Sequence, residues 1–225
     1  MLALAANICS LHKAEQLLEE VIILNNHSTA DYSGLKKFIS SNPQIPFRYL
    51  DSEENLGVAR GRNYAIRQSR GPILIMLDDD AELGNRDALE NLLQEFKEAE
   101  NEKRPRAIVS FKVIYYENRQ MQVNALPHKN FAAYKDKPFF LTYYFAGGAH
   151  AITRESLDAA GLYPEDFFYG MEEYDLSYRI IEAGYSISYT DKVVMLHKES
   201  PQGRQPKNEK IRMMWVNKTK VAWKY

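Results

Sequence analysis

The chain has 225 residues, of which 45% are hydrophobic and 26% charged, so it can bury a full core and form one globular domain. Its 29 Lys and Arg residues nearly balance 30 Asp and Glu residues, and the formal net charge of -1 offers no electrostatic footprint for nucleic acid. The single cysteine, Cys9, excludes an internal disulfide framework and a Cys-rich zinc site. No apolar run approaches the roughly 20 residues of a membrane span, and residues 1–6 lack the basic start of a secretory signal, so we expect a cytoplasmic protein.

Predicted strands and helices alternate through the first half of the chain. Continuous apolar runs predict three buried strands, at residues 21–24, 47–50 and 72–77. Apolar side chains at helical spacing predict three helices, at residues 35–39, 56–70 and 89–99. This alternation favours an α/β fold, a single Rossmann-like domain with a central, mostly parallel sheet flanked by helices.

The second half of the chain is less regular. Apolar segments predict four further strands, at residues 107–116, 139–145, 185–190 and 193–196. Two predicted helices, at residues 153–160 and 172–183, each end before a glycine, and a long polar connection is expected over residues 117–138.

Three consecutive aspartates, Asp78, Asp79 and Asp80, directly follow the predicted strand at 72–77. In open α/β sheets ligands bind beyond the carboxyl ends of the strands. Like charges this close destabilise a fold unless a cation compensates them, and hard oxygen ligands suit Mg²⁺ or Mn²⁺, which bridge to substrate phosphates. The sequence therefore predicts a metal site here, with a solvated acidic turn as the alternative.

A second acidic cluster, Glu172, Glu173 and Asp175, opens the predicted helix at 172–183. Carboxylates in a first turn are favoured by the helix dipole, so helix capping is as good an interpretation as catalysis. His197 ends the last predicted strand, and a lone histidine is more often partly buried and hydrogen-bonded than a metal ligand. These residues alone leave both alternatives open.

Five segments in order resemble the inverting glycosyltransferases of family 2. They lie at residues 21–29, 55–63, 73–80, 147–149 and 172–176 with Arg179. The resemblance implies a glycosyltransferase A fold, a nucleotide-diphosphate-sugar donor and Mn²⁺ or Mg²⁺ as cofactor. It also implies transfer to a hydroxyl acceptor with inversion, in bacterial polysaccharide or glycoconjugate synthesis. Residues 1–197 would form the catalytic domain, with a nucleotide-sugar-binding half at 1–110 and an acceptor-binding half at 111–197.

The resemblance also implies roles for single residues. Asp80 would be the direct metal ligand, His197 would complete the metal site, and Glu173 would be the general base. The residues implied to contact the donor are Asn25, Asn55, Gly57, Arg60, Asn63, Asp78 and Asp79. Those implied on the acceptor side are Gly147, Gly148, Glu172 and Asp175. Helical geometry predicts that Glu172 and Asp175 share a face that Glu173 does not.

The start of the chain departs from the family pattern. Family members usually begin with a strand and a helix before the segment resembled by 21–29, and residues 1–20 look too short to supply both. One alternative is therefore a catalytically impaired paralogue that binds a sugar nucleotide without turnover. A sugar-phosphate nucleotidyltransferase is another, although it should show a Gly-rich signature near its first strand, and residues 1–20 contain no glycine.

Residues 198–225 form a basic segment with eight basic and two acidic side chains. Their apolar spacing predicts an amphipathic helix. The helix either docks on the domain with a solvated basic face or contacts the inner face of the plasma membrane peripherally. The second interpretation fits a lipid-linked acceptor, whereas a plain saccharide acceptor needs no membrane contact.

Overall fold

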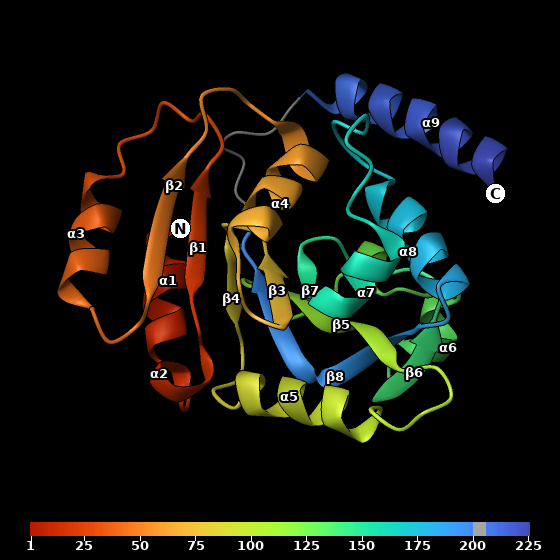
Figure 1. Cartoon of the computed structure of the whole chain (residues 1–225), viewed down its shortest axis with the longest axis horizontal. Coiled ribbons are helices and arrows are strands. Elements are labelled where there is room, and N and C mark those ends of the chain that lie inside the picture. Colours follow the sequence, from red (N-terminus) through yellow and green to blue (C-terminus); the bar gives the residue numbers. More distant parts are fainter. Residues whose placement is uncertain (200–205) are drawn as a thin grey trace.

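The computed structural model describes residues 1–199 and 206–225, so Arg204 of the basic segment lies outside the described residues. The strands form two sheets (Figure 1). The smaller sheet contains two parallel strands, β1 (Val21–Asn25) and β2 (Phe47–Asp51). Three helices lie on its side of the molecule: α1 (Leu2–Cys9), α2 (Ala14–Leu17) and α3 (Ser33–Ser41).

The larger sheet has the strand order β3-β7-β5-β8-β4, and β6 also pairs with β8. Its strands are β3 (Ile73–Leu77), β4 (Ala81–Leu83), β5 (Arg106–Tyr115), β6 (Phe139–Thr142), β7 (Ala149–Thr153) and β8 (Ser186–His197). Among the described residues only β5 and β8 are parallel neighbours in this sheet. The sheet is therefore mixed, and the expected mostly parallel order is wrong. The unpredicted strand β7 lies between β3 and β5 and runs antiparallel to both.

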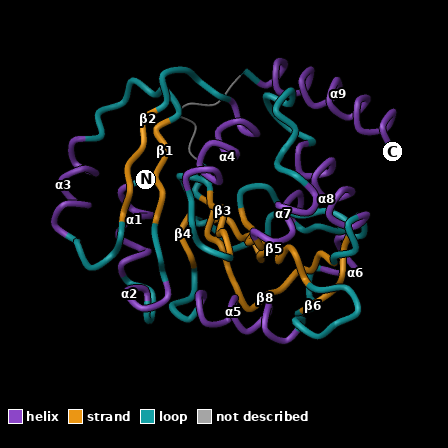
Figure 2. The backbone as a smooth tube through the Cα atoms, in the orientation of Figure 1, coloured by secondary structure: helices purple, strands orange, loops and turns teal. Residues whose placement is uncertain are grey.

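Helices cover both faces of the larger sheet, as the sequence predicts (Figure 2). Val109 and Phe111 of β5 pack toward α5, whereas Ile108 of β5 and Ile152 of β7 pack toward α7 and α8. Fully burying one such side chain typically contributes about 1.5–3 kcal/mol. The covering helices are α4 (Gly57–Gln68), α5 (Ala88–Glu98), α7 (Arg154–Ala160) and α8 (Glu172–Glu182).

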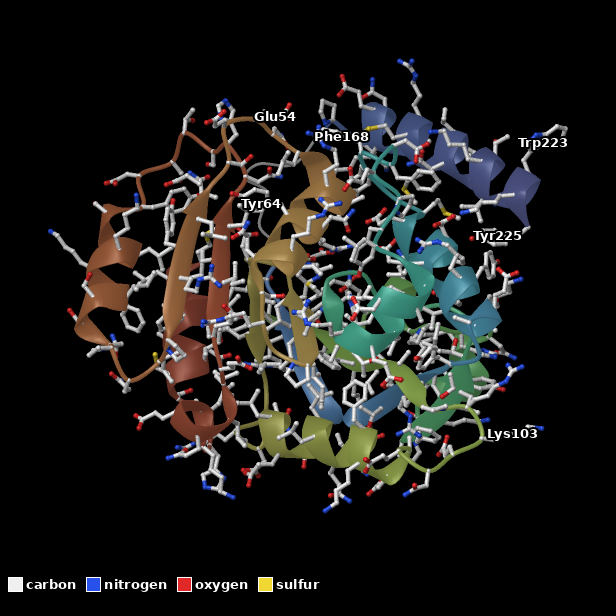
Figure 3. The ribbon with its side chains drawn as sticks, in the orientation of Figure 1. Glu54, Tyr64, Lys103, Phe168, Trp223 and Tyr225 are labelled. Atoms are coloured by element: carbon white, nitrogen blue, oxygen red, sulfur yellow. The ribbon has the colours of Figure 1, made fainter. Side chains whose placement is uncertain are left out.

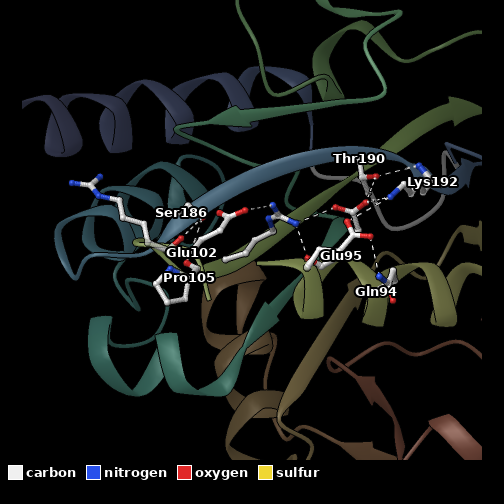
Figure 4. Close-up of polar contacts among 10 residues, drawn as sticks. Gln94, Glu95, Glu102, Pro105, Ser186, Thr190 and Lys192 are labelled. Atoms are coloured by element: carbon white, nitrogen blue, oxygen red, sulfur yellow. Dashed lines mark hydrogen bonds and ion pairs between the residues drawn. The ribbon is translucent and has the colours of Figure 1, made fainter. Parts of the chain in front are cut away.

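A buried ion pair joins α5 to the larger sheet (Figure 4). Arg106 of β5 donates from Nη1 to the main-chain oxygen of Glu95 at 2.6 Å and to its carboxylate at 3.2 Å. Thr190 and Lys192 contact the same carboxylate at 3.2 Å and 2.9 Å. Removing one partner of such a pair leaves a buried charge, which typically costs about 3–5 kcal/mol. Charge as well as apolar packing therefore holds α5 against β5 and β8.

β8 is one continuous strand where the sequence predicts two. Phe111 lies opposite Thr190 and Lys112 lies opposite Val194, so β8 bulges between these two pairs. The polar residues Asp191 and Lys192 fall in the bulge, which explains why the apolar pattern breaks there. The remaining elements are η1 (Val123–Ala125), α6 (Phe131–Tyr134) and α9 (Lys207–Lys224). No helix in the described part of the chain is long and apolar enough to cross a membrane.

The two sheets lie next to each other, but their neighbouring strands β1 and β3 form no pair in the described part of the chain. Within residues 1–199 and 206–225, β1 pairs only with β2, and β3 pairs only with β7. An apolar cavity of about 260 Å³ lies between β1 and β3, and its lining includes Ile22, Ile75 and Leu92. A larger cleft opens beside it at the carboxyl ends of the two strands.

Candidate active site

The larger cleft has a volume of about 1200 Å³ and collects polar side chains from several strand ends. β1 ends at Asn25 and β3 ends before Asp78, so both strands deliver polar residues to the same edge. The predicted residues that line the cleft are Asn25, Asn55, Gly57, Asp78, Asp79, Asp80 and His197. This arrangement matches the expectation that ligands bind beyond the carboxyl ends of strands in α/β folds.

Asp78, Asp80 and His197 form the acidic end of the cleft. Their ligand atoms lie within 4.8 Å of one another. A tight turn links β3 to β4, and Ala81 of β4 pairs with His197 of β8, which places Asp80 beside the imidazole. His197 Nε2 lies 3.3 Å from an Asp80 carboxylate oxygen. On the other side of the ring, His197 Nδ1 donates to the Gln122 amide oxygen at 2.9 Å, which fixes the ring orientation.

The charges of this cluster fit a divalent cation. Desolvation is the main cause that raises the pKa of Asp78, even though the residue keeps exposed surface in the cleft, and the charge of Asp80 raises it further. The hydrogen bond with Asp80 raises the pKa of His197. Two carboxylates and an imidazole are a donor set that accepts Mn²⁺ and, through the oxygens, Mg²⁺. Asp79 is outside this group of three, and its main-chain oxygen accepts a hydrogen bond from the Met1 amino group at 2.8 Å.

The acidic pair at the start of α8 lies beside the cleft, where Arg62 of the cleft lining contacts both carboxyl groups. Gly170 and Met171 have φ angles of 80° and 72°, which turn the chain sharply into the helix. Arg62 Nη1 lies 3.1 Å from Glu172 Oε1 and 3.4 Å from Glu173 Oε1. One guanidinium therefore reaches both carboxyl groups at the first turn of α8. Glu172 and Asp175 are both buried whereas Glu173 is partly exposed, as their predicted helix faces imply.

Glu172 is the more buried member of the pair. Its exposed fraction is 2%, whereas the Glu173 side chain is 18% exposed. Burial, followed by the charge of Glu173, raises the pKa of Glu172 to about 8. Its Oε2 is buried with no hydrogen-bond partner among the described residues. A protonated Glu172 removes one of two adjacent negative charges and leaves the pair able to accept a proton through Glu173.

Gly147 and Gly148 separate the acidic pair from the aspartate cluster. A Cβ atom on Gly147 would overlap Glu173 Oε1, and one on Gly148 would overlap Asp78 Oδ2. The two predicted glycines are therefore needed for the close approach of both carboxylates to the backbone. His150 holds the start of this loop, because His150 Nδ1 donates a hydrogen bond to the main-chain oxygen of Ala146 at 3.0 Å.

A neutral histidine supports this loop. Burial lowers the pKa of His150 to about 3, so its Nε2 accepts a hydrogen bond from the Tyr163 hydroxyl at 2.8 Å. The Tyr163 ring in turn lies under Arg62, with the guanidinium carbon 5.4 Å from the ring centroid. A continuous set of contacts thus runs from the loop 147–148 to the guanidinium that holds the acidic pair.

Among the predicted site residues, Gly147, Gly148, Glu172 and Glu173 lie beside the cleft lining, and Arg60, Asn63 and Asp175 have partners elsewhere. Arg60 forms an exposed ion pair with Glu54 at 2.6 Å. Asn63 is fully buried, and its amide bonds the main chain of Tyr163 at 2.9 Å and 3.0 Å. The helical period explains both positions, because the residues of α4 that line the cleft are Gly57, Val58, Gly61, Arg62 and Ala65, and Arg60 and Asn63 lie on the other side of the helix.

Asp175, expected on the acceptor side, is held away from Glu173. Its carboxylate accepts hydrogen bonds from Arg179 at 2.8 Å, Lys224 at 2.6 Å and the Tyr225 hydroxyl at 3.2 Å. These bonds lower the pKa of Asp175 against the opposing effect of burial, which is the largest single influence. The structure therefore gives Asp175 a contact with α9 in place of the expected acceptor contact.

Sequence reasoning missed Arg62, Asn26 and Gln122. Asn26 accepts a hydrogen bond from Leu56 N at 2.8 Å and donates to Gly57 O at 3.1 Å, which ties the end of β1 to the start of α4. Local sequence does not distinguish Arg62 from Arg60, because Arg60 lies three residues after Gly57 and Arg62 lies five. Asn26 and Gln122 act through contacts between distant segments, so local sequence carries no signal for them.

The model of the family described as glycosyl transferase family 2 matches residues 2–161. A protein of Haemophilus influenzae is 34% identical over 149 residues, which are 64% of this chain and 77% of that protein. The Bacillus subtilis glycosyltransferase YfnE is 26% identical over 81% of this chain and 57% of its own length.

The solved mannosyltransferase PcManGT of Pyrobaculum calidifontis, in complex with GDP-Man and Mn²⁺, has a TM-score of 0.68 with this structure at 23% identity. The match covers 89% of this chain and 53% of that chain. It shows a shared glycosyltransferase A fold. The chain thus spans little more than half the length of PcManGT and of YfnE.

Proposed function

Since the chain belongs to glycosyl transferase family 2, we propose that it moves a sugar from a nucleotide-diphosphate-sugar donor to a hydroxyl of a saccharide or lipid-linked acceptor, with inversion. Such a transfer needs a site for the diphosphate and a base for the hydroxyl. Residues 1–110 would supply most of the donor side and residues 111–197 most of the acceptor side. The product would be a bacterial polysaccharide or another glycoconjugate.

The donor side of the proposal rests on the Asp78, Asp80 and His197 cluster. These residues would hold Mn²⁺ or Mg²⁺, and such a cation neutralises the negative charge that develops on a departing diphosphate. PcManGT was solved with GDP-Man and Mn²⁺, which makes a nucleotide-bound sugar the first donor to test. Asn25, Asn55 and Gly57 line the same cleft and remain predicted donor contacts.

The observation that carries the proposal is the position of Glu173 across two consecutive glycines from Asp78. Because these glycines have no side chains, the partly exposed carboxylate of Glu173 lies next to the place where the donor diphosphate would be held. Glu173 would take the proton from the acceptor hydroxyl while the hydroxyl oxygen bonds to the anomeric carbon and the bond to the diphosphate oxygen breaks. Inversion needs no covalent intermediate, so one base is sufficient.

Within residues 1–199 and 206–225, β1 and β3 do not pair with each other, which favours one alternative, a protein that binds a sugar nucleotide without transferring it. An open boundary between the sheets would let the two sides of the donor cleft move relative to each other. Loss of rigid placement lowers the rate of transfer more than it lowers donor affinity.

A panel of nucleotide sugars in a thermal-shift assay, with and without Mn²⁺, tests the proposal. A ligand at about 100 times its dissociation constant stabilises the fold by about 2.7 kcal/mol. The donor that shifts the melting temperature only with Mn²⁺ is then incubated with the protein, and release of nucleoside diphosphate is measured with and without candidate acceptors. Binding with release supports a transferase, binding without release supports the alternative, and the absence of any metal-dependent shift contradicts both.

A further inference from the structure

One side of α9 exposes large apolar side chains to solvent. We call Ile211, Trp215, Val216 and Trp223 the outer face of α9, and their exposed fractions are 45%, 63%, 50% and 91%. Figure 3 shows Trp223 projecting from the end of the helix away from the rest of the molecule. An isolated exposed apolar residue is common, but four on one helix, two of them tryptophans, mark an interaction surface.

The opposite side of α9 is anchored to the domain. Asn217 is buried and donates from its amide to the main-chain oxygens of Tyr169 and Gly170 at 3.0 Å and 2.9 Å. Val221 is also buried, and Lys224 pairs with Asp175 at 2.6 Å. These contacts fix the rotation of the helix about its axis. The outer face is therefore turned to solvent by specific contacts on the inner side.

Basic side chains accompany the outer face. α9 contains six basic residues and one acidic residue, Glu209. Lys220 and Lys224 form ion pairs with the domain, whereas Lys207, Arg212 and Lys218 are exposed. Lys218 Nζ lies 5.1 Å from the Trp215 ring centroid, so a cation and an aromatic ring share one patch. Tryptophan beside lysine and arginine is the combination that favours the interface of an anionic bilayer.

We propose that the outer face of α9 binds the surface of an anionic lipid membrane. The tryptophans would enter the headgroup region, and Lys207, Arg212 and Lys218 would contact lipid phosphates. The chain as a whole has a net charge of -1, so the attraction would be local to α9 and sensitive to salt. A nucleic acid would use the same cations but would leave the aliphatic side chains uncovered.

Membrane binding would also place the candidate active site. Asn217 contacts the main chain of Tyr169 and Gly170, directly before the turn that presents Glu172 and Glu173. An α-helix is about 10 Å thick, so the membrane would lie about that distance from the turn. A lipid-linked acceptor could then reach the cleft from the bilayer. This link to the acceptor rests on the proposed function, whereas the binding surface itself does not.

The protein offers its own reporter for the test. Trp215 and Trp223 are its two tryptophans, and both belong to the outer face of α9. The full chain is mixed with vesicles of phosphatidylcholine alone or of equal parts phosphatidylcholine and phosphatidylglycerol, without donor or acceptor. We expect a blue shift of the tryptophan emission and co-sedimentation with the anionic vesicles at low salt, and at least about a tenfold loss of binding at high salt.

Two variants separate the contributions. Trp215→Ser with Trp223→Ser, and Lys207→Gln with Arg212→Gln and Lys218→Gln, should each lower co-sedimentation at least about tenfold. The control is Val123→Ser with Leu141→Ser, which removes exposed apolar side chains from another surface and should bind like wild type. Absence of binding to anionic vesicles at low salt, equal binding to both vesicles, or undiminished binding by either variant would overturn the proposal. So would a blue shift without vesicles that follows dimer formation. Because no substrate is present, these results do not depend on whether the transferase proposal is correct.

Discussion

Arg62 and Glu172, 110 residues apart in the chain, meet beside the cleft with Arg62 Nη1 3.1 Å from Glu172 Oε1. The same nitrogen lies 3.4 Å from Glu173 Oε1. One guanidinium therefore sets the positions of both acidic side chains, and Tyr163 supports it from below. The planar guanidinium of arginine can donate to two carboxyl groups at once. The ammonium group of lysine, on its flexible side chain, does so less well.

Arg62→Lys should lower the turnover number by about tenfold or more, because the base would lose its fixed position while the donor cleft keeps its charge. The donor affinity should change far less. Steady-state kinetics separates the two parameters. Arg60→Lys is a matched control on the same helix, since Arg60 pairs with Glu54 on the surface. Equal losses in the two variants would contradict the positioning role.

Glu173→Gln keeps the shape of the side chain and removes its basicity. Transfer should fall by about two orders of magnitude or more, while donor affinity stays near the wild-type value. Glu182→Gln, an exposed residue at the other end of α8, should transfer normally. If Glu173→Gln is active and Glu172→Gln is not, the more buried member of the pair is the base.

Asp80→Ala should abolish the Mn²⁺-dependent part of nucleotide binding, because it removes one of the three candidate metal ligands. Calorimetric titration of a nucleoside diphosphate with and without Mn²⁺ measures this part directly. The fold should survive, since the change also relieves repulsion with Asp78. Asp136→Ala, at a side chain that is 81% exposed, is the control. Undiminished Mn²⁺-dependent affinity in Asp80→Ala would remove this residue from the metal site.

Gly147→Ala and Gly148→Ala should produce different defects. The new methyl group of Gly147→Ala would displace Glu173, and that of Gly148→Ala would displace Asp78. We therefore expect about tenfold or greater loss of turnover in the first variant and a matching loss of donor affinity in the second. Gly34→Ala has open space around the added atom and should behave like wild type. Identical defects in the two cleft variants would show that the loop acts only as a structural unit.

The buried carboxyl of Glu172 predicts a pH dependence of stability. Its pKa of about 8 in the folded protein is above the ordinary value of 4.5. Between these two pKa values the folded protein holds a proton that the unfolded chain has lost, so the contribution to stability decreases as pH rises through that window. Glu172→Gln has no proton to lose. Its melting temperature relative to wild type should therefore rise from about pH 5 to about pH 9.

Thermal denaturation at several pH values in that range measures the difference. Glu182→Gln should keep a constant difference from wild type, because its side chain is exposed. A constant difference for Glu172→Gln as well would mean that Glu172 titrates at its ordinary pKa and is not protonated at neutral pH.

Several features of this protein follow from its sequence alone. Apolar runs and helical spacing located β1, β2, β3, α4, α5 and α8, because each of these elements buries a continuous face and its side chains show the period of that face. The sequence also identified three short polar or glycine segments: the aspartates after β3, the glycines 147–148 and the acidic start of α8. Each is recognisable because its like residues are consecutive in the chain. The same local patterns missed β4, which has only three residues, and β7, whose sequence of two alanines, a histidine, an isoleucine and a threonine forms no continuous apolar run.

Other features were decided only by the tertiary structure. Strand order depends on which edges meet, so the mixed sheet could not be read from an alternating pattern that is also typical of a parallel one. Arg60 and Arg62 are equally plausible ligands in the sequence, and the packing of α4 turns only Arg62 into the cleft. Asp175 and Glu173 are two positions apart on one helix, yet Lys224 holds the first and Arg62 the second. Residue type and spacing determine which chemistry is available, whereas long-range packing determines which side chains share a low-dielectric cleft and act on one another.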